Sequence, residues 1–132
     1  MLDSSFFYAM IVMLFGKGGK MIDTVREGLL YTLYGFLLTE KQKRIFEAYH
    51  FDDLSLSEIA ENLNISKQAV SDQLNRSSDK LDMVEKELKL LQKIQLYHSY
   101  LHSMEEVCRQ SDIDRTHLLE YIEKMKSLFE IV

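Results

Sequence analysis

The chain has no proline and only five glycines among its 132 residues. Two of the glycines are adjacent near the N-terminus, so the rest of the sequence has almost no residue that interrupts a helix. Strand-rich folds usually need more turn residues than this. Because 46% of the residues are hydrophobic and 28% are charged, the composition is that of a globular protein. We therefore expect one all-α protein with long helices.

The first twenty residues differ from the rest. Residues 6–15 form an apolar run that is too short to cross a bilayer, and Asp3, with no basic residue, precedes it, unlike a signal peptide. Lys17, two glycines and Lys20 then stand directly before Met21, as if a purine-rich ribosome-binding sequence had been translated in frame. We expect Met21 to be the natural start and residues 1–20 to be a translated leader. The alternative is an amphipathic or buried N-terminal helix.

Three polar residues mark where helices should begin. Thr39 stands three residues before Gln42 and Ser55 three before Glu58, which is the spacing of a capping box. Ser66 should cap a further helix. The expected elements are a first helix over 24–36, a second from residue 40 to about residue 51, a short third helix from residue 56, and a long fourth helix from residue 67. The inner side of the second helix should carry Ile45, Phe46, Tyr49 and His50.

The third and fourth of these helices carry a helix-turn-helix pattern. Ala60 supplies the small residue needed where the two helices come closest. Asn64, four residues later, tolerates the left-handed conformation that the turn requires. Val70, six residues further on, supplies an aliphatic core residue. The remaining inward positions are filled by Ile59, Leu63, Ile65 and Leu74.

The outward face of the fourth helix is polar, as expected of a helix that enters the major groove of DNA. Amide side chains suit adenine edges, and basic side chains suit guanine or phosphate. The residues expected to contact DNA are Lys67, Gln68, Ser71, Asp72, Asn75 and Arg76. Backbone contacts are expected from Lys41, Lys43, Arg44 and Ser66, although the basic residues of the second helix fit an ordinary solvated face equally well.

The charge of the chain keeps a second interpretation open. The formal net charge is −5, and between Ser57 and Lys80 three basic residues stand against four acidic ones. DNA affinity depends heavily on neutralising phosphates, so this module brings little positive charge of its own. The alternative is that the two helices form a docking surface for a protein or an RNA.

Three segments together resemble the YlxM family, small helix-turn-helix proteins encoded beside the genes of the signal recognition particle. The segments are residues 37–42, 55–60 and 64–70, and the resemblance extends over about 24–95. The helix-turn-helix is also similar to the promoter-reading C-terminal domain of sigma factors. The resemblance implies a regulator or an accessory factor of the signal recognition particle pathway. Where a glycine is common at the turn, this chain has Asn64.

The sequence after the helix-turn-helix predicts two further helical segments. Apolar residues at Leu81, Val84, Leu88 and Leu91 follow a heptad-like spacing, continued by Gln95 and His98, so the fourth helix should run without a break well past residue 90. We expect domain boundaries at 21–80 for the helix-turn-helix and 81–132 for the helix continuation and a last helix. The stripe fits either packing within the chain or the seam of a homodimer. Ser111 and Asp114 should cap the last helix, whose apolar face comprises Ile113, Leu118, Tyr121, Ile122, Met125, Leu128, Phe129 and Val132.

No pattern of catalytic residues stands out, and we expect a protein that is not an enzyme, with no cofactor and no metal. His98 and His102 are one helical turn apart, but no acidic residue lies between them as in a metalloprotease helix. The lone Cys108 fits a small buried residue of a protein in a reducing compartment. We expect a cytoplasmic homodimer that does not insert into membranes and whose partners are DNA or components of the signal recognition particle.

Overall fold

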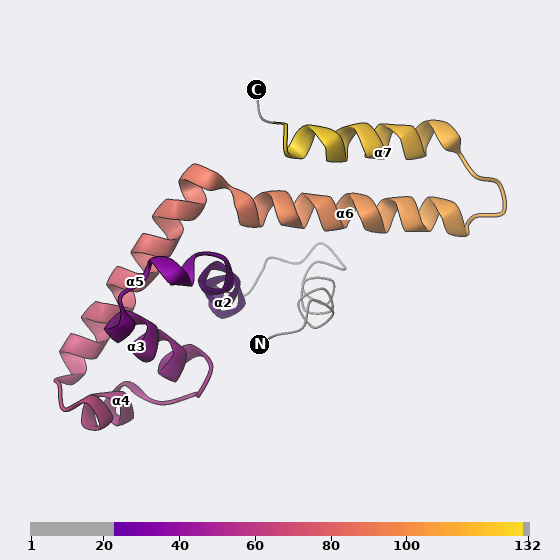
Figure 1. Ribbon diagram of the computed structural model, residues 1–132. Helices are drawn as coiled ribbons and strands as arrows, with labels where there is room; N and C mark the ends of the chain where they lie inside the picture. The colour runs from indigo at the N-terminus through magenta and orange to yellow at the C-terminus, as the bar shows by residue number, and fades with distance from the viewer. Residues whose placement is uncertain (1–22, 131–132) are drawn as a thin grey trace. The chain divides into compact units, whose positions relative to one another are not determined.

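The computed structural model describes residues 23–130, so the expectation of a leader at residues 1–20 lies outside the described residues. Within this range every regular element is helical and no strand occurs, which confirms the all-α fold class (Figure 1). The elements are α2 (Asp23–Tyr34), the 3-10 turn η1 (Gly35–Leu37), α3 (Glu40–His50), α4 (Leu56–Leu63), α5 (Lys67–Leu88), α6 (Leu90–Arg109) and α7 (Arg115–Leu128). They fall into two compact units, one ending at Lys89 and the other beginning at Leu90.

The helix starts of the first unit lie where the capping residues predict them. The Thr39 hydroxyl accepts a hydrogen bond from the Gln42 amide at 3.2 Å, and the Gln42 side chain accepts one from the Thr39 amide at 3.1 Å. Ser55 and Glu58 form the same reciprocal pair at the start of α4. Ser66 caps α5 by accepting a hydrogen bond from the Ala69 amide at 3.0 Å. These side chains bind amides that a helix start otherwise leaves unpaired, and the three predicted starts are confirmed.

Helices α2, α3 and α4 all pack against α5, which is the longest helix of the first unit (Figure 1). One cluster of buried side chains joins α3, α4 and α5 and contains Ile45, Ile59, Ala60, Val70 and Leu74. Leu29, Leu30 and Tyr34 of α2 are also buried. Burial of these side chains is the main stabilisation of the unit, at about 25 cal/mol for each Å² of apolar surface removed from water.

The inner side of α3 differs from the prediction at one position. Ile45 and Phe46 are fully buried as expected, but Tyr49 is 42% exposed. His50 takes the inward position instead, and its ring stacks on Phe46 with the ring centres 4.1 Å apart. The Tyr49 ring lies edge-on beside His50, at the rim of this aromatic cluster.

The long helix is broken at Lys89, so the prediction of one continuous helix past residue 90 is wrong. Helix α5 ends at Leu88, Lys89 adopts the left-handed conformation with φ 55°, and α6 begins at Leu90. The physical reason lies in the packing of the last turns of α5. Leu81 and Glu85 are buried, and the Tyr34 hydroxyl donates a hydrogen bond to Glu85 at 3.2 Å. This places residues 81–89 in the same compact unit as the helix-turn-helix.

The second unit is a hairpin in which α6 and α7 lie antiparallel and side by side (Figure 1). Asp114 caps α7 by accepting hydrogen bonds from the amides of Thr116 and His117, as predicted. Ser111 lies in the preceding bend, so its prediction as a cap is wrong, because Asp114 already binds these amides. The rings of Tyr100 and Tyr121 are 6.2 Å apart across the hairpin. Among the described helices, none has the length and apolar character needed to cross a membrane.

Candidate nucleic-acid interface

The turn between α4 and α5 has the conformation that the sequence predicts. Asn64 is left-handed at φ 52°, and its amide donates a hydrogen bond to the Glu61 carbonyl at 3.2 Å. The next amide, of Ile65, returns to the Ala60 carbonyl at 3.0 Å. Ala60 and Val70 are both buried where the two helices meet. The two helices therefore form a helix-turn-helix.

The outward face of α5 is polar and accessible. On this face the Gln68 side chain donates a hydrogen bond to the Asp72 carboxylate, with Nε2 2.9 Å from Oδ1. Because the Asp72 carboxylate holds the Gln68 amide nitrogen, the carboxamide has a fixed direction on this face. The residues exposed there are Lys67, Gln68, Asp72, Asn75 and Arg76, while Ser71 is half-buried and Ser66 is exposed but uses its hydroxyl as the helix cap.

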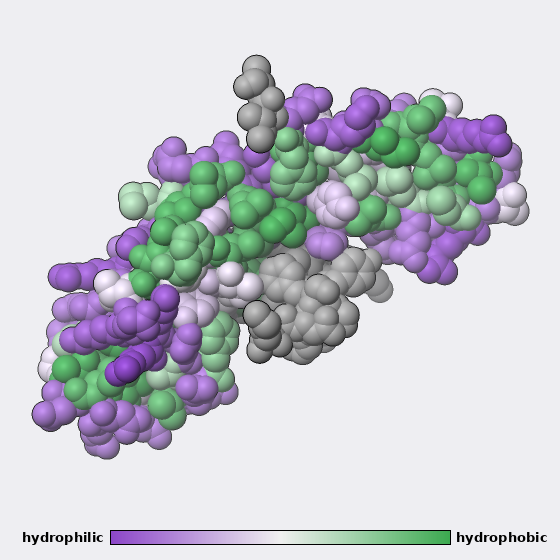
Figure 2. All heavy atoms as spheres, viewed as in Figure 1, coloured by the Kyte–Doolittle hydropathy of each residue, from purple (hydrophilic) through white to green (hydrophobic). Residues whose placement is uncertain are grey.

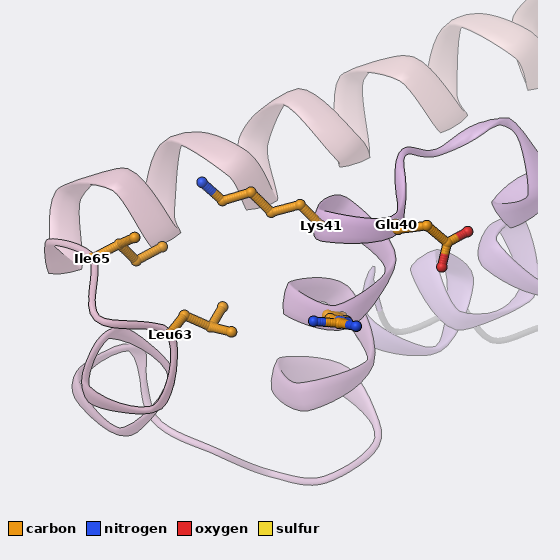
Figure 3. A pocket seen from close by; sticks show the side chains of 5 residues that line it. Glu40, Lys41, Leu63 and Ile65 are labelled. Carbon is orange, nitrogen blue, oxygen red and sulfur yellow. The ribbon is translucent and has the colours of Figure 1, made fainter.

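A pocket of about 380 Å³ brings residues of α3 to the turn that precedes α5 (Figure 3). Leu63 and Ile65 form its apolar side. Lys41 extends toward this side of the pocket and Glu40 points the other way, as Figure 3 shows. Arg44 also lines the pocket. The first turns of α3 thus place two basic side chains beside the start of α5.

The three basic residues of α3 do not share one environment. Lys43 is half-buried, pairs with Glu40 at 3.3 Å and does not line the pocket. Lys41 and Arg44 are exposed and make no ion pair with any residue in the described range. Of the basic side chains predicted to contact a phosphate backbone from α3, the structure therefore brings Lys41 and Arg44 together and leaves Lys43 apart.

The acidic residues near the module have defined roles. The pKa of Glu58 lies below its ordinary value, mainly because the Ser55 backbone amide donates a hydrogen bond to its carboxylate. This carboxylate therefore remains ionised as part of the α4 cap.

A second pocket, of about 340 Å³, lies at the other end of α3 and is lined by Asp53 and Glu58 together with Tyr49 and His50. Its acidic lining is opposite in sign to the Lys41 and Arg44 pocket.

The sequence predicts neither pocket. It places Leu63 and Ile65 at inward positions, and both do pack against the buried cluster of α3, α4 and α5. Both are half-buried, and their exposed parts form the apolar side of the first pocket. Half-burial beside a turn depends on how α3 packs, which no local pattern shows.

In the described range, no three His, Cys, Asp or Glu side chains gather in a way that would hold a metal ion. Cys108, expected to be buried, is exposed in the last turn of α6.

Comparison with known proteins agrees with this fold. Residues 21–116 match the UPF0122 family, described as "Putative helix-turn-helix protein, YlxM / p13 like". A UPF0122 protein of Mycoplasma capricolum is 38% identical over 116 residues, which cover 88% of this chain and 94% of the relative. The UPF0122 protein YlxM of Bacillus subtilis is 38% identical over 104 residues, covering 77% of this chain and 94% of the relative.

A UPF0122 protein of Caldanaerobacter subterraneus subsp. tengcongensis is more similar over a shorter range. It is 52% identical over 67 residues, which cover 51% of this chain and 57% of the relative. The match of the family model extends over more than half of the chain and includes the whole helix-turn-helix. The chain therefore belongs to the UPF0122 family of YlxM-like helix-turn-helix proteins.

Proposed function

We propose that this protein is a DNA-binding regulator that reads the major groove with α5. The observation that carries the proposal is the position of Lys41 and Arg44 at the pocket beside the turn that leads into α5. A helix that enters the major groove needs positive charge at its flanks, where the phosphate backbone passes. Lys67 on the first turn of α5 adds a third exposed basic side chain close in sequence to Ile65.

The face of α5 itself supports the proposal through its hydrogen-bonding groups. Gln68 and Asn75 are exposed amides, which suit adenine edges, and Arg76 suits guanine or a phosphate. Phosphate contacts fix the position of a protein on DNA, whereas base contacts select the sequence. In this proposal Lys41, Arg44 and Lys67 have the first role, and Gln68 and Asn75 have the second.

Titration with duplex DNA at several salt concentrations tests the proposal. We expect the affinity to fall as salt rises, with a slope on a log–log plot of roughly −0.9 for each phosphate contacted. The double variant Lys41→Ala/Arg44→Ala should reduce this slope by up to about two units. Lys86→Ala removes one positive charge from the far end of α5, away from the pocket, and should leave the slope unchanged. Absence of binding to a random duplex pool at low salt would remove the proposal.

A second candidate is an accessory factor of the signal recognition particle machinery that uses the same surface to dock on a protein or RNA. Asp72 favours it, because a carboxylate in the middle of the exposed α5 face repels a phosphate backbone. Capture of partners from a lysate with and without nuclease separates the two functions. A partner retained after DNase and RNase treatment supports protein docking, and one lost only with RNase supports an RNA.

A further inference from the structure

Helix α7 carries two apolar stripes, and the hairpin covers only one of them. Leu118, Tyr121, Met125 and Leu128 are half-buried and form the inner stripe, which packs on α6. Leu119, Ile122, Lys126 and Phe129 form the outer stripe, whose three apolar residues are all exposed. Figure 2 shows apolar side chains gathered along the hairpin between hydrophilic margins.

The hairpin has almost no interior of its own. No residue of α7 is buried, and in α6 only Leu91 is. Two helices that cover each other on one side leave too little buried surface for a stable unit, because most helical stability comes from packing an apolar face. Leu119, the most exposed apolar residue of the outer stripe, is 61% exposed. A further helical layer over this face would supply the missing interior.

The spacing of the outer stripe is that of a helix–helix seam. Its positions follow one another at three, four and three residues, which is the heptad spacing of a coiled coil. The stripe rises over about 15 Å, close to three turns. A seam of this length matches one helix lying alongside another.

The charges of the outer stripe fit a second copy of the same chain. Lys126 lies within the stripe and pairs at 3.2 Å with Glu123, which lies beside the stripe, so the one charge of the seam is accompanied by a charge of the opposite sign. The exposed charges of α7 in and beside the stripe are of both signs, so a partner of one sign would meet repulsion as well as attraction; they are Glu120, Glu123, Lys124 and Lys126. A second copy brings both charges and leaves the seam neutral.

We infer that the outer stripe of α7 is the seam of a twofold homodimer in which two α7 helices pack antiparallel. Seam positions then pair first with last, so Leu119 lies against Phe129 of the second copy and Ile122 against the aliphatic stem of Lys126 of the second copy. The ammonium group of Lys126 reaches the rim, where Glu123 is available from either chain. The two hairpins together form a four-helix layer with a common interior.

Sedimentation of the full chain and three variants tests the inference. The unmodified protein should sediment with twice the chain mass of 15.5 kDa. Leu119→Glu puts a charge against Phe129 of the second copy and should weaken association at least about tenfold, or roughly 1.4 kcal/mol. Ser127→Glu adds the same charge on an exposed position outside both stripes and should leave association unchanged. Leu119→Glu/Phe129→Lys pairs opposite charges in the antiparallel seam and should restore the dimer.

Three results would overturn the inference. The first is a monomer across the micromolar range. The second is an unchanged mass for Leu119→Glu, or an equal loss of association for Ser127→Glu. The third is failure of the double variant to associate when both of its single variants are folded monomers. Far-UV circular dichroism checks folding, and the uncharged Leu119→Gln gives the smaller change in association if the glutamate variant loses helix.

Discussion

The Nε2 atom of His50 lies 3.0 Å from a carboxylate oxygen of Glu27, and this pair joins the end of α3 to α2. The His50 side chain is 7% exposed, and its Nδ1 atom has no hydrogen-bond partner among the described residues. Of the two ring nitrogens, Nε2 therefore faces Glu27 and donates the hydrogen bond to its carboxylate. A hydrogen bond from Ser78 of α5 also reaches Glu27, so this carboxylate links three helices of the first unit.

This linkage predicts a loss of stability in acid. The pKa of Glu27 lies below its ordinary 4.5, mainly because of the hydrogen bond from His50. The ionised Glu27 carboxylate therefore contributes fully to stability when the pH is above its ordinary pKa. This contribution is lost as the pH falls through the lowered pKa of the folded state. Glu27→Gln should lower the free energy of unfolding near neutral pH and flatten the decline in acid, as measured by urea unfolding at a series of pH values. Ser78→Ala should change the dependence of the free energy of unfolding on pH in the same direction, but by less. If the free energy of unfolding of Glu27→Gln declined in acid as steeply as that of the parent protein, the linkage would be contradicted.

The local features of the first unit could be predicted from the sequence because each depends on residues close together. The capping boxes at Thr39 and Ser55 need only a residue three positions away, and the turn at Asn64 needs only a side chain that tolerates positive φ. The burial of Ala60 and Val70 follows from the helix-turn-helix spacing. The inward position of His50 in place of Tyr49 could not be predicted, because it depends on Glu27 and Phe46 rather than on the periodicity of α3.

Substitution of Ala60 tests the helix crossing. Ala60→Leu places three more carbon atoms in the cluster formed with Ile59 and Val70, so we expect the free energy of unfolding to fall by about 1–3 kcal/mol. Glu61→Leu places the same leucine side chain at the next, exposed position and should alter stability by less than about 0.5 kcal/mol. Chemical denaturation of both variants measures the difference. Equal stabilities for the two variants would place the helix contact elsewhere.

The candidate interface could be predicted in part. The exposure of Lys67, Gln68 and Asn75 follows from helical spacing, and the bond between Gln68 and Asp72 follows from their separation of four residues. The grouping of Lys41 and Arg44 without Lys43 could not be predicted. It depends on how α3 packs against the turn, and three basic residues within four positions look alike in the sequence.

Under the proposed DNA-binding function, Gln68 and Lys67 should differ in how their replacement affects binding. Gln68→Ala removes an oriented amide, so it should weaken binding to the selected sequence by about 1–3 kcal/mol and leave binding to unrelated DNA unchanged. Lys67→Ala should weaken binding to all sequences and reduce the salt slope by about one unit, and Arg76→Ala should do the same if Arg76 contacts a phosphate. Fluorescence anisotropy with duplexes from an in vitro selection measures both effects. Equal losses on selected and unrelated DNA for Gln68→Ala would remove it from base recognition.

The break between α5 and α6 has no local signal. Residues 85–92 contain no glycine, proline or asparagine, and the heptad-like spacing of Leu81, Val84, Leu88 and Leu91 continues across the break. A non-glycine residue in the left-handed conformation costs about 1–2 kcal/mol, and Lys89 adopts it with its amide bonded to the Glu85 carbonyl at 2.7 Å. The contact nearest the break that the local pattern does not show is the hydrogen bond from Tyr34 of α2 to Glu85, which fixes the last turn of α5 within the first unit.

Replacement of Lys89 by glycine tests this break directly. Glycine adopts the left-handed conformation without strain, so Lys89→Gly should raise the free energy of unfolding by about 0.5–1 kcal/mol after its larger loss of backbone entropy is counted. Lys86→Gly makes the same chemical change three residues earlier, inside α5, and should lower the free energy of unfolding by about 1 kcal/mol. Urea unfolding of the two variants side by side gives the sign of each change. If α5 and α6 formed one continuous helix in solution, position 89 would lie in a helix interior, and both substitutions would destabilise the protein to a similar extent.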